Sequence, residues 1–174
     1  MFEHPLPATF RPLKLARQQG KLKGYMPLRQ LPTLVADCID DGGNVEADLQ
    51  LEMQGRWPVM TGTVQATVRM TCQRCLEAVD VQLRADMALG FSQSEEALEE
   101  LPEALEPYLL EEEEIPLADV LEQELILTLP IVAYHAECKP ADYEQPPEPV
   151  AAVSEKPNPF KVLEQLKGQT KKSD

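Results

Sequence analysis

Three segments of this chain alternate between hydrophobic and polar residues, the pattern of a strand with one buried and one solvent-exposed face. They cover residues 45–54, 63–71 and 79–91. Turn residues at 54–58 separate the first two segments, and a Cys-x-x-Cys sequence at 72–75 separates the second from the third. Strands buried on one face only are typical of antiparallel sheets. The pattern therefore predicts a meander of three long strands whose outer edges need covering.

A helical pattern follows the strands at residues 116–129 and ends at Pro130. We expect this helix to pack on the apolar face of the sheet. Short helical segments within residues 11–30 and a further strand near residues 108–110 would accompany it. The predicted fold class is α+β, an antiparallel meander sheet packed by a few helices, with a flexible C-terminal tail. The apolar face of the long helix comprises Leu117, Val120, Leu121, Leu125 and Thr128.

The periodic patterns stop near residue 140, so we predict that the α+β domain covers residues 1–140. Residues 141–156 are rich in proline and show no periodicity, as expected of a linker. Residues 157–174 are predicted to form a short helix and a basic tail. A helix this short is marginal on its own, so it either docks on the domain or folds on a partner. Its apolar stripe, the candidate partner-binding site, comprises Phe160, Leu163 and Leu166.

Charge is segregated along the chain, which has a formal net charge of −14. Residues 95–124 contain thirteen acidic residues and no basic one, whereas residues 1–30 contain six basic residues against one acid. A uniform negative charge would repel nucleic acid, but a basic segment can still contact phosphates. Both blocks are also compatible with ordinary solvated surfaces. The candidate RNA-binding residues are Arg11, Lys14, Arg17, Lys21, Lys23 and Arg29.

Several features indicate a cytoplasmic protein that does not bind membranes. The N-terminus lacks the charged start and apolar stretch of a signal peptide, and no window approaches 18 uninterrupted apolar residues. Four cysteines are too few for a disulfide scaffold at this length, so a reduced compartment is expected.

The cysteines suggest a metal site. Cys72 and Cys75 have the spacing of a metal-binding knuckle, and His135 and Cys138 could complete a Cys₃His set suited to structural zinc. This requires the chain to return to the turn that holds the first pair. The favoured interpretation is that Cys72 and Cys75 are two thiols in a turn and that the protein has no cofactor, with structural zinc as the alternative. A thioredoxin-like redox pair is disfavoured, because such a pair lies at a helix N-terminus and not between strands.

No sequence motif indicates an enzyme: the chain has two histidines and lacks phosphate-binding and nucleophile-elbow motifs. Aromatic residues are too few for an obvious base-stacking platform. Trp57, next to Arg56 in a turn, is the one aromatic residue that we would test for stacking. The alternative, that Trp57 caps the core of the sheet, is favoured.

Four stretches of the chain carry a resemblance to a known family. They are Met70-Thr-Cys-Gln-Arg-Cys75, Leu101-Pro-Glu-Ala-Leu-Glu-Pro107, Leu121-Glu-Gln-Glu-Leu-Ile-Leu-Thr-Leu-Pro-Ile-Val132 and Lys156-Pro-Asn-Pro-Phe-Lys-Val-Leu-Glu-Gln-Leu166. In this order they resemble the YceD family, the large ribosomal RNA subunit accumulation proteins. The resemblance implies a cytoplasmic, non-catalytic factor associated with synthesis, processing or stability of large-subunit (23S) ribosomal RNA. Some relatives carry more cysteines near the end of the domain, where this chain keeps His135 and Cys138.

We therefore expect an accessory factor that works by binding a large-subunit precursor. The basic ends would contact ribosomal RNA, and the acidic segment would hold a basic ribosomal protein or another assembly factor. One alternative is an adaptor that binds only protein, through its C-terminal helix. A thiol oxidoreductase is a further alternative.

Overall fold

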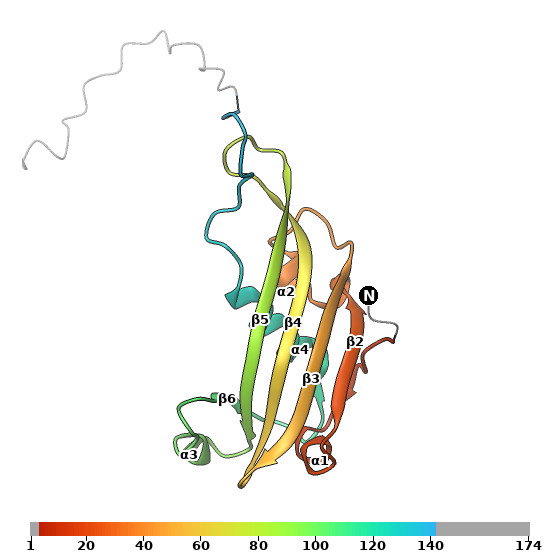
Figure 1. The fold of residues 1–174 in the computed structure, drawn as a ribbon, viewed down its shortest axis with the longest axis vertical. Helices are drawn as coiled ribbons and strands as arrows, with labels where there is room; N and C mark the ends of the chain where they lie inside the picture. The colour runs from red at the N-terminus through yellow and green to blue at the C-terminus, as the bar shows by residue number, and fades with distance from the viewer. Residues whose placement is uncertain (1–3, 142–174) are drawn as a thin grey trace, which may run out of the picture. The chain divides into compact units, whose positions relative to one another are not determined.

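The structure, a computed structural model, describes residues 4–141 and has an α+β fold (Figure 1). A five-stranded sheet has the order β2-β3-β4-β5-β6. No helix within this range is long and apolar enough to cross a membrane. The predicted linker, the C-terminal helix and its stripe of Phe160, Leu163 and Leu166 lie outside the described residues. The strands of the sheet are β2 Lys21–Pro27, β3 Asn44–Gln54, β4 Trp57–Thr71, β5 Ala78–Ser92 and β6 Glu106–Leu109.

The predicted meander of three long strands is confirmed. β3 pairs antiparallel with β4, and β4 pairs antiparallel with β5, so that Val64 lies between Ala47 and Ala85. These three side chains lie on the buried face of the sheet. At Gly62, β4 approaches β3 so closely that a Cβ would lie 2.1 Å from the carbonyl oxygen of Asp48. The backbone φ of +143° at this position also favours glycine.

Short helical segments were expected within residues 11–30, and two are present, but the strand between them was not predicted. Helix α1 covers Pro12–Arg17, and a single 3₁₀ turn covers Leu28–Gln30, but Lys21–Pro27 forms strand β2. Gly24 suits this edge of the sheet because a Cβ there would lie 2.3 Å from the carbonyl oxygen of His4. Backbone hydrogen bonds of 2.8–2.9 Å join Tyr25 to His4 and Leu6, which cover the edge of β2.

Strand β6 confirms the strand expected near residue 108, but it pairs parallel to β5. A parallel pair cannot be joined by a tight turn, so the acidic residues 93–105 form the crossover between the two strands. This crossover contains the short helix α3, Glu95–Leu98, whose N-cap Ser94 accepts a hydrogen bond from the Ala97 backbone N–H at 3.2 Å. The sheet is therefore mixed, and only its β2–β5 part is antiparallel.

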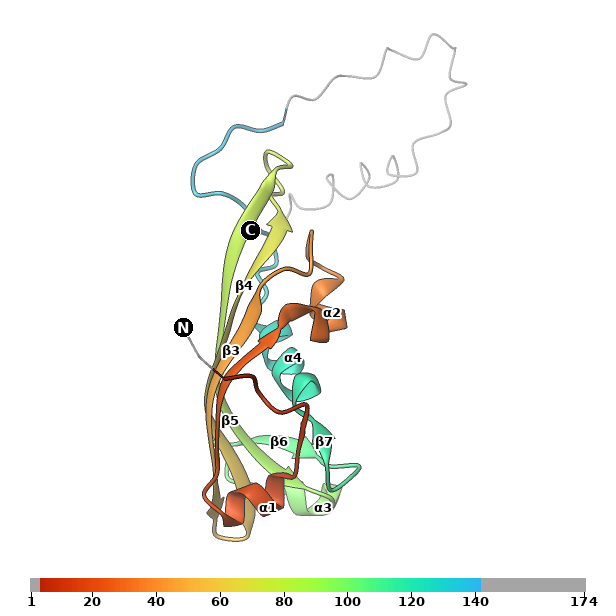
Figure 2. The same ribbon diagram turned by 90° about the vertical axis from the view of Figure 1, so that its right-hand side faces the viewer.

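Helix α4, Leu117–Leu127, covers one face of the sheet together with the short helix α2, Pro32–Val35 (Figure 2). Glu122 on α4 accepts hydrogen bonds from the backbone N–H groups of Thr33 and Leu34, at 2.6 and 3.0 Å, and so caps α2. A small antiparallel ladder of β1, Thr9–Phe10, and β7, Ile115–Pro116, leads into α4. The side chains of Leu117, Val120, Leu121 and Leu125 are fully buried, as the helical pattern predicted.

We expect Leu121→Ala to lower the free energy of unfolding by about 2–5 kcal/mol, because it leaves a cavity between α4 and the sheet. Leu127 on the same helix is 76% exposed, so Leu127→Ala should change stability by no more than about 0.5 kcal/mol. Urea unfolding followed by circular dichroism measures both. Equal losses in the two variants would contradict the packing of α4 on the sheet.

Glu124 is the charged side chain that α4 buries, and burial raises its pKa, with a further contribution from Glu106. A raised pKa in the folded state costs stability at pH values above it, and the cost disappears near pH 4. We therefore expect Glu124→Gln to stabilise the protein at pH 7 by on the order of 1 kcal/mol or less, and to have no such effect near pH 4. Urea unfolding at both pH values measures this. The exposed Glu112→Gln is the control for net charge.

Candidate metal centre and cationic groove

The turn between β4 and β5 forms a cysteine knuckle. Two backbone hydrogen bonds close it: Cys72 N–H donates to the Glu77 carbonyl at 2.8 Å, and Leu76 N–H donates to the Cys72 carbonyl at 2.9 Å. Within the turn, the backbone N–H of Cys75 lowers the pKa of the Cys72 thiol to about 5, and that of Arg74 acts in the same direction. The knuckle therefore stabilises a thiolate at Cys72, the form of cysteine that binds metals.

The chain returns to this knuckle after α4, as a Cys₃His site requires. Gln73 N–H donates to the Ala133 carbonyl at 2.9 Å, and Ala141 N–H donates to the Arg74 carbonyl at the same distance. The Arg74 side chain donates to the carbonyls of His135 and Cys138, both at 3.3 Å. The knuckle and the returning segment are thus joined by hydrogen bonds on both sides of the cysteines.

These contacts bring Cys72, Cys75, His135 and Cys138 together, with their ligand atoms all within 4.8 Å of one another. The Sγ atoms of Cys72 and Cys138 are 3.8 Å apart, and Cys75 Sγ lies 3.3 Å from His135 Nδ1. Two sulfurs bound tetrahedrally to one zinc ion at 2.3 Å would be about 3.8 Å apart. The set therefore fits zinc in its donor atoms and in this spacing.

The orientation of His135 also suits a metal ligand. Its Nε2 lies 3.1 Å from the carbonyl oxygen of Ala78, which can only accept a hydrogen bond, so Nε2 carries the proton. The lone pair of Nδ1 then faces the cysteines. A ring nitrogen fixed by a hydrogen bond to a carbonyl is typical of metal-binding histidines.

The fourth donor, Cys138, differs from Cys72 in its protonation. Burial raises its pKa to about 11, and its hydrogen bonds with Cys72 and Cys75 add to this effect. A divalent cation among the four donors would release this proton, because a bound metal favours the thiolate. Cys38 lies outside the cluster, and its thiol donates to the Leu34 carbonyl at 3.3 Å.

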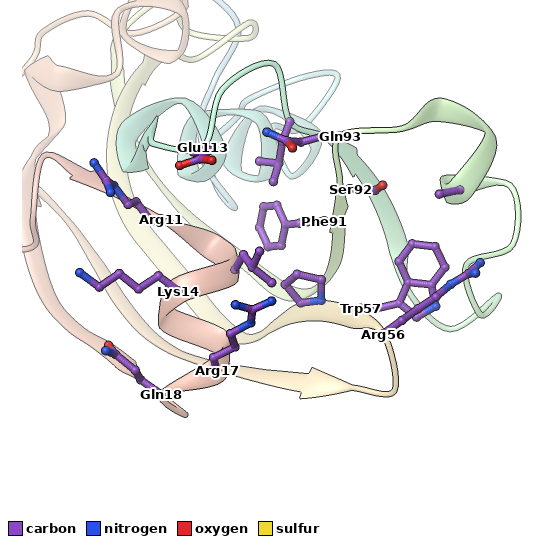
Figure 3. A pocket seen from close by; sticks show the side chains of 14 residues that line it. Arg11, Lys14, Arg17, Gln18, Arg56, Trp57, Phe91, Ser92, Gln93 and Glu113 are labelled. Carbon is purple, nitrogen blue, oxygen red and sulfur yellow. The ribbon is translucent and has the colours of Figure 1, made fainter.

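Three of the six predicted RNA-binding residues line one groove. Arg11, Lys14 and Arg17 lie along α1, at one side of a depression of about 690 Å³ (Figure 3). Arg56 and Trp57, at the turn from β3 to β4, form the other side. Figure 3 shows Phe91 at the floor between these two sides. We refer to this depression as the α1 groove.

The other three predicted residues lie elsewhere. Lys21 and Lys23 are on the exposed face of β2, and Lys23 forms an ion pair with Asp48 on β3. Arg29 lies in the 3₁₀ turn that follows β2. Arg17, Lys21 and Arg29 form no ion pair within residues 4–141. The six basic residues therefore do not form one continuous surface.

Part of the acidic segment neutralises the N-terminal bases. Glu114 accepts a hydrogen bond from the Thr9 hydroxyl at 2.6 Å and pairs with the Arg11 guanidinium at 2.8 Å. Thr9 and then Arg11 hold the pKa of the Glu114 carboxyl below its ordinary value. Glu114 therefore neutralises the charge of Arg11. It does not pair with Lys14 or Arg17, which lie farther along α1.

Arg56, which was not among the six predicted RNA contacts, also lines the α1 groove. The Arg56 guanidinium lies over the Trp57 ring, 4.4 Å from its centroid, and forms an ion pair with Glu100. Trp57 itself is only 8% exposed, in agreement with its expected role at the edge of the core. The Arg56-Trp57 pair in a turn was the available signal. Nothing in the sequence showed that α1 lies opposite.

Two comparisons relate the chain to known proteins. The family model described as "Large ribosomal RNA subunit accumulation protein YceD" matches residues 60–167, a span that contains all four candidate metal ligands. A curated protein of that name from Haemophilus influenzae is 34% identical over 174 residues, which cover 93% of this chain and 96% of the relative. No solved structure matches the chain.

Proposed function

This chain belongs to the YceD family of large ribosomal RNA subunit accumulation proteins, and from this we propose that it supports large-subunit ribosomal RNA by binding, without catalysing a reaction. It would act in the cytoplasm on a precursor of the large subunit. Accumulation of an RNA can be raised by a protein that covers it or guides its assembly, and neither role needs a catalytic residue.

The observation that carries this proposal is the α1 groove. In a chain with a net charge of −14, it places Lys14 and Arg17, which form no ion pair within residues 4–141, around one depression with the Glu100-paired Arg56. Local positive charge of this kind attracts phosphates even when the whole protein is acidic. The exposed acids of residues 95–124 would face basic ribosomal proteins or another assembly factor, and this part of the proposal rests on charge alone.

We further propose that Cys72, Cys75, His135 and Cys138 hold a structural zinc ion. The donor set, the 3.8 Å sulfur separation and the hydrogen bond from His135 to Ala78 support this proposal. With four protein ligands the site would be closed, which is the arrangement of structural and not of catalytic zinc. Its role would be to fasten the segment after α4 to the tip of the β4–β5 hairpin.

The binding proposal predicts that the full-length protein sediments with large-subunit precursors in cell extract. Association should be strong at low salt and weaken steeply as salt is raised, because phosphate contacts release counterions. Sucrose gradients at two salt concentrations, with and without nuclease, measure this. A chain cut after residue 150 should still associate with the precursors. If the protein were instead an adaptor that depends on its C-terminal helix, the same cut would abolish this association. Absence from precursor fractions even at low salt would contradict the proposal.

The zinc proposal predicts about one zinc ion per purified chain, measured by elemental mass spectrometry. Cys72→Ser and His135→Ala should reduce this content to near zero, because each removes one of four ligands. Cys38→Ser is the matched control and should leave the content unchanged. A wild-type protein prepared with zinc present that retains none after dialysis would overturn the proposal, as would an equal loss in Cys38→Ser.

A further inference from the structure

The side of the α1 groove opposite α1 carries a flat cationic surface. The Arg56 guanidinium lies 4.4 Å above the centroid of the Trp57 ring. Its ion pair with Glu100 fixes the same guanidinium from another direction. The Arg56 side chain is 58% exposed, whereas Trp57 is 8% exposed. The surface presented to a ligand is therefore the outer plane of the guanidinium, with the indole ring as its support.

The α1 side of the groove and its floor provide chemical groups of other kinds. Arg17 extends from α1 toward the middle of the groove in Figure 3, and Lys14 lies one helical turn before it. Leu13, Pro58 and Phe91 make the surface between the two sides partly apolar. Polar groups that both donate and accept hydrogen bonds are provided by Gln18, Ser92 and Gln93.

Charge within the groove is not uniform. Glu113 lies at the end near Arg11, and Arg11 is already paired with Glu114. Lys14 and Arg17 form no ion pair within residues 4–141, and of the two Arg17 lies farther from the Glu113 end in Figure 3. An anionic group would thus be held near Arg17 and repelled from the Glu113 end. Arg56, which is paired with Glu100, offers its planar surface rather than an uncompensated charge.

We propose that the α1 groove binds a single-stranded RNA segment, with one base stacked on the Arg56 guanidinium and the adjoining phosphate held by Arg17. This inference rests on the proposed function and assigns its RNA contact to one place on the fold. Unstacked bases bind aromatic rings and arginine planes, and they are available only in single strands and loops. An acidic peptide would need the positive charge but not the planar surface, so the stacked pair favours RNA.

The fluorescence of Trp57 provides a direct readout of binding in the groove, because Trp57 is the one tryptophan of the chain and lies under Arg56. A single-stranded RNA oligonucleotide of mixed sequence should change the intrinsic fluorescence of the full-length protein in a saturable manner. Double-stranded RNA of the same length and a glutamate-rich peptide are the comparison ligands. Both should bind at least about tenfold more weakly, because neither offers an unstacked base.

Substitutions separate stacking from charge. Arg56→Gln should weaken binding of the single strand about tenfold, the effect of losing one stacked base. Arg56→Lys should weaken it nearly as much, because lysine keeps the charge but has no planar group. Arg17→Gln should weaken binding and reduce the dependence of log affinity on log salt by about 0.7, as expected for one lost phosphate contact. Lys21→Gln, which removes an exposed charge outside the groove, should leave binding unchanged.

Three results would overturn this assignment. The first is an Arg56→Lys variant that binds as tightly as the wild type. The second is a glutamate-rich peptide that binds as tightly as the single strand. The third is RNA binding, detected by fluorescence anisotropy of labelled RNA, that leaves Trp57 unaffected and is insensitive to Arg17→Gln. This third result would leave the proposed function standing and move its RNA contact elsewhere. Absence of RNA binding by both methods, together with absence from precursor fractions, would contradict both the assignment of the groove and the proposed function.

Discussion

The need to cover one apolar face of a long antiparallel meander governs the rest of this structure. Strands β3, β4 and β5 bury every second side chain on the same face, and that face is too large to leave exposed. Helices α1 and α4 both pack on this face. The side chains of Leu117, Val120, Leu121 and Leu125 of α4 are fully buried there. Because α4 must lie across the sheet, the segment that follows it emerges beside β5 and can reach the tip of the β4–β5 hairpin. The cysteine-histidine cluster is thus a consequence of how the core is closed.

The sequence predicted those elements whose signal is local. The strict alternation in β3, β4 and β5 and the one-sided pattern in α4 both come from burial on a single face, so both were visible in the chain. Strand β2 was missed because residues 11–30, with Gly24 and Pro27 among them, were interpreted as short helical segments. Gly24 instead permits the close approach of His4, and Pro27 lies at the last position of the strand. Parallel pairing of β6 was also missed, since four residues carry no signal for strand direction.

The two candidate sites also differ in how much of their signal is local in the sequence. The spacing of Cys72 and Cys75 and of His135 and Cys138 indicated a Cys₃His set, and only the return of the chain had to be assumed. The α1 groove had no comparable signal, because Arg17 and Arg56 are far apart in the sequence and meet through the fold. The basic residues near the N-terminus looked like one surface in the sequence. In the structure β2 takes Lys21 and Lys23 to the opposite, exposed face of the sheet, and α1 keeps Arg11, Lys14 and Arg17 together.

The candidate metal centre and the α1 groove lie at opposite ends of the β4–β5 hairpin (Figure 1). Each strand has 15 residues, so the two sites are separated by roughly 40–50 Å. That separation is several times the Debye length of about 8 Å at physiological salt, so charge at one site has almost no electrostatic effect on the other. Any influence between them must pass through the hairpin itself. The two ends can therefore serve separate tasks, one fastening the returning chain and the other meeting a ligand.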